Sequence, residues 1–139
     1  MNKKTTKKTV WLIEDEEALI DMYGSALKKL GFEIVSDTTG WASMDRIKRI
    51  KEGKEEEPDL LLLDLLLPDL NGIQLLQEIR EHSETKDLPV FILTNYTAPE
   101  LKEMGFGLQV EKYLLKTDRI PSKLAGRVQE RLEGEPKNP

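Results

Sequence analysis

The stretch that decides the fold is Leu60-Leu61-Leu62-Leu63-Asp64, in which four apolar residues end in a carboxylate. The run has no polar alternation, as expected of a central parallel strand that is covered on both faces. Leucine has only modest strand propensity, so this prediction depends on the length of the run and on its flanks. Asp64 interrupts the apolar pattern, because three more leucines follow it. It is therefore the first candidate for a functional residue.

Apolar runs of strand length alternate five times with stretches of helical periodicity. The predicted strands are Val10–Ile13, Phe32–Val35, Leu60–Leu63, Pro89–Leu93 and Tyr113–Leu115. Strands that alternate with helices in this way predict an α/β fold, in which a parallel sheet has helices on both faces. Ligands of such folds bind at the carboxyl ends of the strands, which is where chemistry is expected.

Helical spacing of apolar residues predicts the segments between the strands. The first helix is expected to end at Gly31, and Thr38 or Thr39 is expected to cap the second. The charge-rich stretch Lys51–Pro58 is expected to be a solvated connector. The apolar residues that recur at helical spacing in the first helix are Ala18, Leu19, Met22, Tyr23, Ala26, Leu27 and Leu30. The second helix is expected to have Trp41, Met44, Ile47 and Ile50 on its inner face, and the third to have Gly72, Leu75, Leu76 and Ile79 along one side. Ala98–Met104 is a short, weakly patterned helix, and Ile120, Leu124, Val128 and Leu132 mark a final amphipathic helix.

Length and composition limit the class of protein. The chain has 139 residues, enough for one domain, and lacks cysteine, which excludes disulfides and zinc-thiolate sites. Its net charge is -5, so a nucleic-acid interface is not expected. Every apolar run is far short of the roughly 20 residues of a membrane span. We therefore expect a cytoplasmic protein with no direct nucleic-acid or membrane contact, and no output domain after the last predicted helix.

Polar residues follow four of the five predicted strands. They are Glu14 and Asp15, Asp64, Thr94, and Lys116. Three carboxylates at one edge of a sheet repel one another, and a hard divalent cation such as Mg²⁺ relieves this repulsion. The ammonium of Lys116 balances the remaining charge.

This set of groups is suited to phosphoryl transfer onto a carboxylate. Cation and ammonium neutralise the phosphoryl oxygens, Thr94 donates a hydrogen bond, and Asp64 is the best candidate nucleophile. Each residue also has a simpler interpretation: Asp15 could cap the following helix, Thr94 could be a turn residue, and Lys116 could be solvated. Their joint occurrence at strand ends favours the functional interpretation.

The motifs around these residues resemble the receiver domain of response regulators in bacterial two-component systems. They are Leu12–Glu17, Leu63–Gly72, Ile92–Thr94 and Tyr113–Lys116, in the right order and at the right spacing. The resemblance implies a flavodoxin-like (βα)5 fold, a doubly wound five-stranded parallel sheet in the order 2-1-3-4-5. It also implies a disordered basic leader at residues 1–8, a receiver domain at 9–133 and a tail at 134–139.

The resemblance implies a metal-dependent phosphoacceptor. Asp64 would accept a phosphoryl group from a sensor histidine kinase, a phosphotransfer protein or a small phosphodonor. Asp15, Asp64 and the backbone carbonyl of Leu66 would bind Mg²⁺, with Glu14 acting largely through metal-bound water. The chain would catalyse its own phosphorylation and dephosphorylation and would have no metabolic substrate.

The resemblance also implies a switch. Lys116 would hold one phosphoryl oxygen, Thr94 would turn inward to bind another, and Tyr113 would fill the space that Thr94 leaves. The surface formed by the fourth helix, fifth strand and fifth helix would then change, and a downstream effector or a second copy of the chain would bind there. Tyr113 could equally be an ordinary half-buried aromatic residue.

Two other classes of function compete with this one. A pseudo-receiver has the same fold but binds partners independently of phosphate; it is favoured by Thr117, where the family usually has proline, and by Asn95, where it usually has a small residue. The turn Gly105–Val110 is also longer than usual. An unrelated flavodoxin-like nucleotide-binding or flavin-binding fold is disfavoured, because no glycine-rich loop follows the first strand.

Two positions predict how long a phosphoryl group lasts. Leu66 and Tyr96 each stand two residues after a site residue, and their bulk is expected to hinder attack by water. A phosphoryl group on Asp64 is therefore expected to persist for hours. The lone histidine, His82, is predicted to be an ordinary surface residue.

Overall fold

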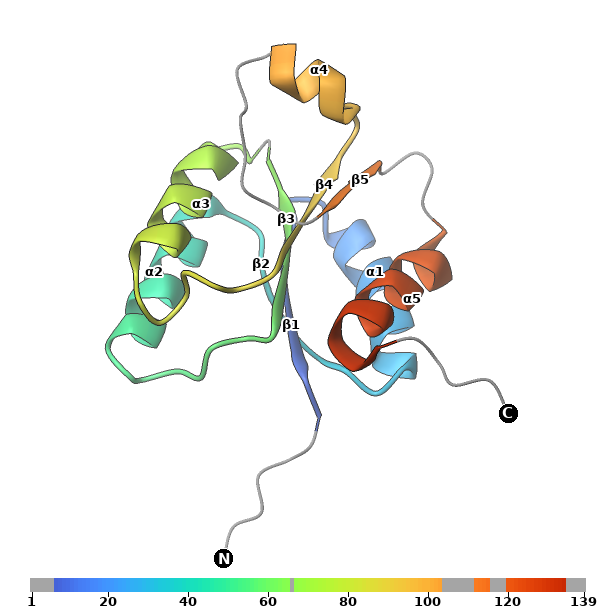
Figure 1. Ribbon diagram of the computed structural model, residues 1–139, viewed down its shortest axis with the longest axis horizontal. Helices are drawn as coiled ribbons and strands as arrows, with labels where there is room; N and C mark the ends of the chain where they lie inside the picture. The colour runs from blue at the N-terminus through green and yellow to red at the C-terminus, as the bar shows by residue number, and fades with distance from the viewer. Residues whose placement is uncertain (1–6, 66, 104–111, 116–119, 135–139) are drawn as a thin grey trace, which may run out of the picture.

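The structure is a computed structural model that describes residues 7–65, 67–103, 112–115 and 120–134. In chain order its elements are β1 (Thr9–Ile13), α1 (Glu17–Lys29), β2 (Glu33–Asp37), α2 (Gly40–Lys51), β3 (Leu60–Asp64), α3 (Gly72–Glu81), β4 (Val90–Thr94), α4 (Ala98–Glu103), β5 (Lys112–Leu115) and α5 (Pro121–Glu133). Figure 1 shows α1 and α5 on one side of the sheet and α2 and α3 on the other.

The five strands form one parallel sheet in the order β2-β1-β3-β4-β5. This confirms the predicted doubly wound fold and its strand order. β3 lies between β1 and β4, with Leu63 opposite Ile13 and Asp64 opposite Leu93. Because the strands are parallel, the residues that follow β1, β3 and β4 emerge at the same edge of the sheet.

The leucine run of β3 is buried from both faces, as its composition predicts. Leu60 and Leu62 pack in the cluster that includes α1 and α5 side chains, whereas Leu61 and Leu63 pack in the cluster with α2 and α3. All four are fully buried. Burying a leucine contributes about 1.5–3 kcal/mol, so this strand anchors the core and holds the following residue, Asp64, in a fixed position.

The second strand ends later than the sequence suggests. The predicted range was Phe32–Val35, but β2 spans Glu33–Asp37, and Phe32 is buried just before it. The last two residues of β2 pair in register with Leu12 and Ile13 of β1. Both are polar, so hydrophobicity could not reveal that the strand continues.

The prediction that Trp41 lies on the inner face of α2 is wrong, because its side chain is 61% exposed. The predicted face was spaced at every third residue, whereas an α-helix turns about 100° per residue. Residues spaced in this way do not stay on one side of the helix. Trp41 and Ile50 are about two and a half turns apart and therefore lie on opposite sides. Ile47 and Ile50 are buried, as predicted.

Local hydrogen bonds fix the ends of three helices. The hydroxyl of Thr39 accepts the N–H of Ala42 at 3.1 Å, which confirms a threonine cap and selects Thr39 over its neighbour. Gly31 follows α1 with a φ of 95°, a conformation that favours glycine, as predicted for the end of this helix. Thr97 and Glu100 form a reciprocal capping box at α4 that the sequence analysis did not identify.

Most of the connector after α2 is exposed, as predicted, but Glu55 binds it to α2. Glu55 forms ion pairs with Arg46 and Arg49 of α2. Arg46 in turn donates to the carboxylate of Asp37 at 2.7 Å, and the same oxygen accepts the indole N–H of Trp11 at 2.8 Å. The connector, α2, β1 and β2 are thus joined by one polar network.

Some sequence predictions lie outside the described residues. They are most of the leader 1–8 and of the tail 134–139, the long turn Gly105–Val110, and the position of Thr117. In the described ranges, no helix has both the length and the apolar character that crossing a membrane requires.

Candidate functional site

Three carboxylates meet at the carboxyl edge of the sheet. Glu14 and Asp15 follow β1, Asp64 is the last residue of β3, and one carboxylate oxygen from each lies within 4.8 Å of the other two. Glu14 is fully buried and Asp64 is 4% exposed, whereas Asp15 is exposed. The structure therefore brings together the three acidic residues that the sequence singled out.

Backbone contacts hold Glu14 in place. Its N–H donates to the carbonyl of Asp37 at the end of β2, at 3.1 Å. Its carboxylate accepts the N–H of Glu16 at 3.2 Å. Glu16, and not Asp15, is the N-cap residue of α1, so the alternative interpretation of Asp15 as a helix cap is wrong.

Glycine is required where α3 approaches the end of β3. A Cβ atom on Gly72 would lie 2.7 Å from the Cα of Leu65 and 3.2 Å from the carbonyl oxygen of Asp64. The N–H of Gly72 donates to the carbonyl of Leu65 at 2.9 Å. This close approach fixes the backbone at Asp64 and helps to place its carboxylate beside the acidic pair.

Thr94 is the last residue of β4, the strand next to β3, and is 3% exposed. Its hydroxyl oxygen accepts the N–H of Tyr96 at 3.0 Å. That bond makes a local turn, as the simpler interpretation of Thr94 predicts, and it leaves the hydroxyl proton available for another acceptor.

Three further residues complete the predicted site. Leu66 and Lys116 lie outside the described residues, and so does the side chain of Tyr113. The backbone of β5 is described and pairs Thr94 with Leu115, the residue before Lys116. The roles of Leu66, Lys116 and Tyr113 therefore stay predictions.

A carboxylate to which the sequence analysis gave no role joins the loop after β3 to α2. Asp69 accepts the N–H groups of Gly40 and Trp41 at 2.8 and 3.1 Å. The hydrogen bond from Gly40, followed by that from Trp41, lowers the pKa of Asp69 despite partial desolvation. The partners are about thirty residues apart in sequence, so no local pattern could have identified this contact.

A hollow of about 440 Å³ opens beside Asp15. Its lining residues are Asp15, Leu65, Leu67, Pro68, Asp69, Leu70, Asn71 and Gln74. Most of them belong to the loop between β3 and α3, so the position of this loop sets the shape of the approach to the site.

His82 is less exposed than predicted. Its side chain is 17% exposed, and its Nε2 lies 2.7 Å from a carboxylate oxygen of Glu78, four residues earlier on α3. It is the C-cap residue of α3, and its ring contacts Glu78 rather than the acidic residues of the site, so we assign it no chemical role.

The donor set fits a hard divalent cation. Oxygen ligands are those that Mg²⁺ prefers, and a site with few carboxylates leaves room for its waters. Two of the three carboxylates are buried, and clustered buried carboxylates are costly unless a positive charge balances them. Glu14, Asp15 and Asp64 can therefore hold such a cation.

Comparison with known proteins identifies the same family that the sequence motifs resemble. The response regulator receiver domain family matches residues 10–128. The phosphate regulon transcriptional regulatory protein PhoB of Rhizobium meliloti is 32% identical over 114 residues, which cover 82% of this chain and 48% of PhoB. The chain spans about half the length of the curated relatives it matches.

Solved structures share the fold. The phosphorylated cyanobacterial phytochrome response regulator RcpA is 26% identical, with a TM-score of 0.78 over 91% of this chain and 94% of RcpA. The receiver domain of the sensor histidine kinase PA1611 from Pseudomonas aeruginosa PAO1 is 22% identical, with a TM-score of 0.77 over 94% of this chain and all of that one. Its structure has a magnesium ion coordinated in the active site cleft.

Proposed function

Because this chain belongs to the response regulator receiver domain family of two-component systems, we propose that it is a phosphorylation switch in which Asp64 is the phosphoacceptor. The observation that carries the proposal is the convergence of Glu14, Asp15 and Asp64, with their carboxylate oxygens within 4.8 Å. Of the three, Asp64 is the one on the central strand, and it is almost fully buried.

In the proposed reaction, the carboxylate of Asp64 attacks the phosphorus of a phosphohistidine on a sensor kinase or phosphotransfer protein. A P–O bond to Asp64 forms, the P–N bond breaks, and the imidazole leaves and takes up a proton. Mg²⁺, held by Glu14, Asp15, Asp64 and the backbone carbonyl of Leu66, would supply positive charge that offsets the phosphoryl oxygens. Lys116 would bind one of those oxygens.

Switching would begin at Thr94. A phosphoryl oxygen on Asp64 is a strong acceptor, and the buried hydroxyl of Thr94 has a proton to donate. Turning toward that oxygen would break the bond from the N–H of Tyr96 and open space for Tyr113. The α4-β5-α5 surface would then change from its unphosphorylated to its phosphorylated conformation. The added charge at Asp64 would thus shift an equilibrium between two conformations.

We place the receiver unit at residues 9–133, from β1 to α5. We propose that it acts in the cytoplasm between a histidine kinase or phosphotransfer protein and a downstream effector. Phosphorylation could also favour a homodimer through α4-β5-α5. The pseudo-receiver alternative differs from this proposal only in the chemistry at Asp64, so an experiment at that residue distinguishes them.

Amide NMR spectra of the protein, recorded with and without Mg²⁺ and beryllofluoride, a phosphoryl mimic, test this proposal. The proposal predicts shifts at Thr94 and in β5 that require both reagents and that vanish in Asp64→Asn. Asp45→Asn is a matched control, because it removes one exposed carboxylate from α2 and is expected to change nothing. Wild-type spectra that do not respond would favour the pseudo-receiver.

A further inference from the structure

A fourth carboxylate lies next in the structure to the acidic residues of the site without being one of the three that meet there. Asp37 is the last residue of β2 and pairs with Ile13, the last residue of β1. Its main-chain carbonyl accepts the N–H of Glu14 at 3.1 Å. Its side chain is only 10% exposed. The residue that holds the backbone of Glu14 therefore has a nearly buried carboxylate, which needs partners of its own.

Two donors from different elements bind the carboxylate of Asp37. The indole N–H of Trp11, on β1, donates to it at 2.8 Å, and Nε of Arg46, on α2, donates to the same oxygen at 2.7 Å. The guanidinium carbon of Arg46 also lies 6.0 Å from the centroid of the Trp11 ring, within the range of a cation–π contact. The side chain of Asp37 is thus held between β1 and α2.

Arg46 supplies the positive charge that allows this carboxylate to remain buried. Its own side chain is 14% exposed, and a second ion pair, with Glu55, limits its movement. Without Arg46, the carboxylate of Asp37 would keep one neutral donor and an unbalanced charge, and moving toward water would then lower its free energy. The main-chain carbonyl that holds Glu14 belongs to the same residue and would move with it.

We propose that Asp37 is a positioning residue which, held by Arg46, aligns Glu14 to bind the divalent cation. The inference rests on the proposed function, because it requires that a cation binds at the three carboxylates. Residues that orient the ligands of a metal site without contacting the metal typically contribute roughly 10- to 100-fold to its affinity. Because Asp37 acts through the main chain, we expect an effect of about tenfold, at the lower end of this range.

Isothermal titration calorimetry of the full chain with Mg²⁺ tests the inference, because charge and positioning predict opposite results for Arg46→Met. Methionine keeps an unbranched apolar stem and removes the donors to Asp37. On charge alone, removing a positive charge strengthens the attraction of a cation, so Mg²⁺ would bind more tightly. Loss of positioning should instead weaken Mg²⁺ binding by about tenfold. Arg46→Lys keeps the charge and can still donate to Asp37, so it should restore most of the wild-type affinity.

Arg49→Met is the matched control. Arg49 lies three residues further along α2 and pairs with Glu55 rather than with Asp37, at 2.9 Å. The same substitution there should leave the affinity for Mg²⁺ close to that of the wild type. Urea unfolding without Mg²⁺ shows whether each variant is folded, and Arg46→Gln takes the place of Arg46→Met in the comparison if that variant does not fold.

The results separate this inference from the proposed function. Binding of Mg²⁺ by the wild type, together with unchanged or tighter binding by Arg46→Met, would overturn the positioning role and leave the cation site standing. A loss of affinity that Arg49→Met shares to the same extent would overturn the role too. A wild-type chain that does not bind Mg²⁺ would contradict the proposed function and, with it, this inference.

Discussion

Asp69 accepts the backbone N–H of Gly40 at 2.8 Å and so joins the loop that follows β3 to the first residue of α2. The contact is tight, because a Cβ atom on Gly40 would lie 2.3 Å from the Cβ of Leu70, in the same loop. The loop lines the approach to Asp15. The position of α2 is thereby tied to the shape of the candidate site.

Gly40→Ala is expected to destabilise the protein by about 1–3 kcal/mol, because the added methyl group overlaps Leu70 and the loop must move. Urea unfolding measures the loss. Gly24→Ala is a useful comparison, since a Cβ atom there meets nothing within 4 Å. Equal stability of Gly40→Ala and the wild type would show that the loop is not held in this way.

Asp69→Asn is expected to lower stability at neutral pH, because its hydrogen bonds to Gly40 and Trp41 lower the pKa of Asp69 in the folded state. A lowered pKa stabilises the folded state at pH values above the ordinary pKa range of an aspartate. This stabilisation is lost as the pH falls through the pKa of the folded state. The deficit should therefore shrink in acid. Urea unfolding at several pH values measures the deficit, with Asp45→Asn as the matched control for the loss of one exposed carboxylate. A deficit for Asp69→Asn that does not change with pH would contradict the account.

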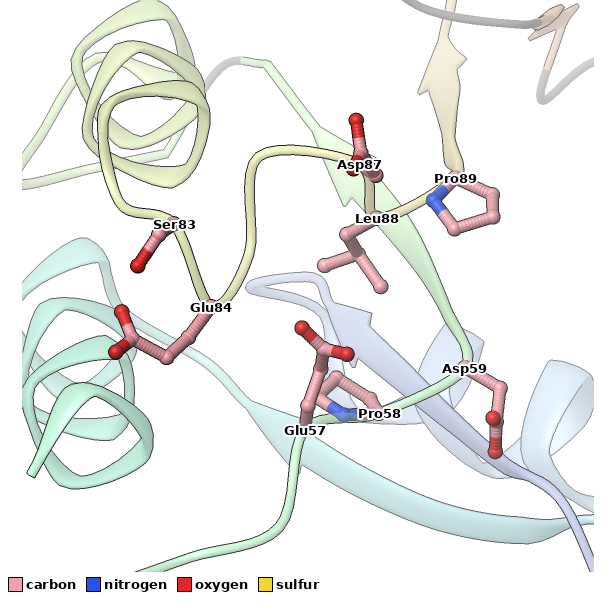
Figure 2. Close-up of a pocket in the computed structure, with 8 residues that line it drawn as sticks. All are labelled: Glu57, Pro58, Asp59, Ser83, Glu84, Asp87, Leu88 and Pro89. Carbon is pink, nitrogen blue, oxygen red and sulfur yellow. The ribbon is translucent and has the colours of Figure 1, made fainter. Parts of the chain in front are cut away.

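Glu57→Gln is expected to stabilise the protein at neutral pH. Figure 2 shows Glu57 in a pocket at the start of β3, with Asp59, Glu84 and Asp87 also lining it. Desolvation, followed by repulsion from these three carboxylates, raises the pKa of Glu57. A raised pKa favours the folded state at pH values below the ordinary pKa range of a glutamate. This advantage is lost as the pH rises through the pKa of the folded state.

The gain from Glu57→Gln should therefore be present near pH 7, shrink in added salt and vanish in acid. Thermal melts at several pH values measure it. Glu33→Gln removes the same charge from an exposed position on β2 and is expected to have little effect. If the two variants behave alike, the carboxylates around Glu57 do not repel it appreciably.

The fold was largely predictable from sequence, and the exceptions have physical causes. The strand Leu60–Leu63 was evident because burial on both faces requires a continuous apolar run. The end of β2 was not, because its last two residues are polar and are held only by pairing with β1. The exposure of Trp41 was missed because a spacing of three residues imitates a helical face over a short stretch.

At the site, the acidic residues were predictable because they follow strands that end at the same edge. The contact between Asp69 and α2 and the network around Arg46 were not, because both join segments remote in sequence through polar side chains. Glycine at position 72 could be placed on α3, but only the structure reveals that a side chain there would overlap the backbone of Leu65.

Tyr96→Ala is expected to shorten the life of a phosphoryl group on Asp64 several-fold. The side chain of Tyr96 is half-buried against the core on the α2–α3 side, and its N–H donates to Thr94. A bulky ring at this place is expected to hinder attack by water. Decay in Mg²⁺ without kinase should take hours in the wild type and in the control Tyr96→Phe. A wild-type half-life of seconds would contradict the prediction.

The central claim is that Asp64 accepts a phosphoryl group in a Mg²⁺-dependent reaction, and intact-mass spectrometry after incubation with a small phosphodonor tests it most directly. The account predicts that one phosphoryl group is added in Mg²⁺, that chelation of the metal abolishes the addition, and that Asp64→Asn stays unmodified. An unmodified wild type, or an Asp64→Asn variant that is modified as readily as the wild type, would contradict it.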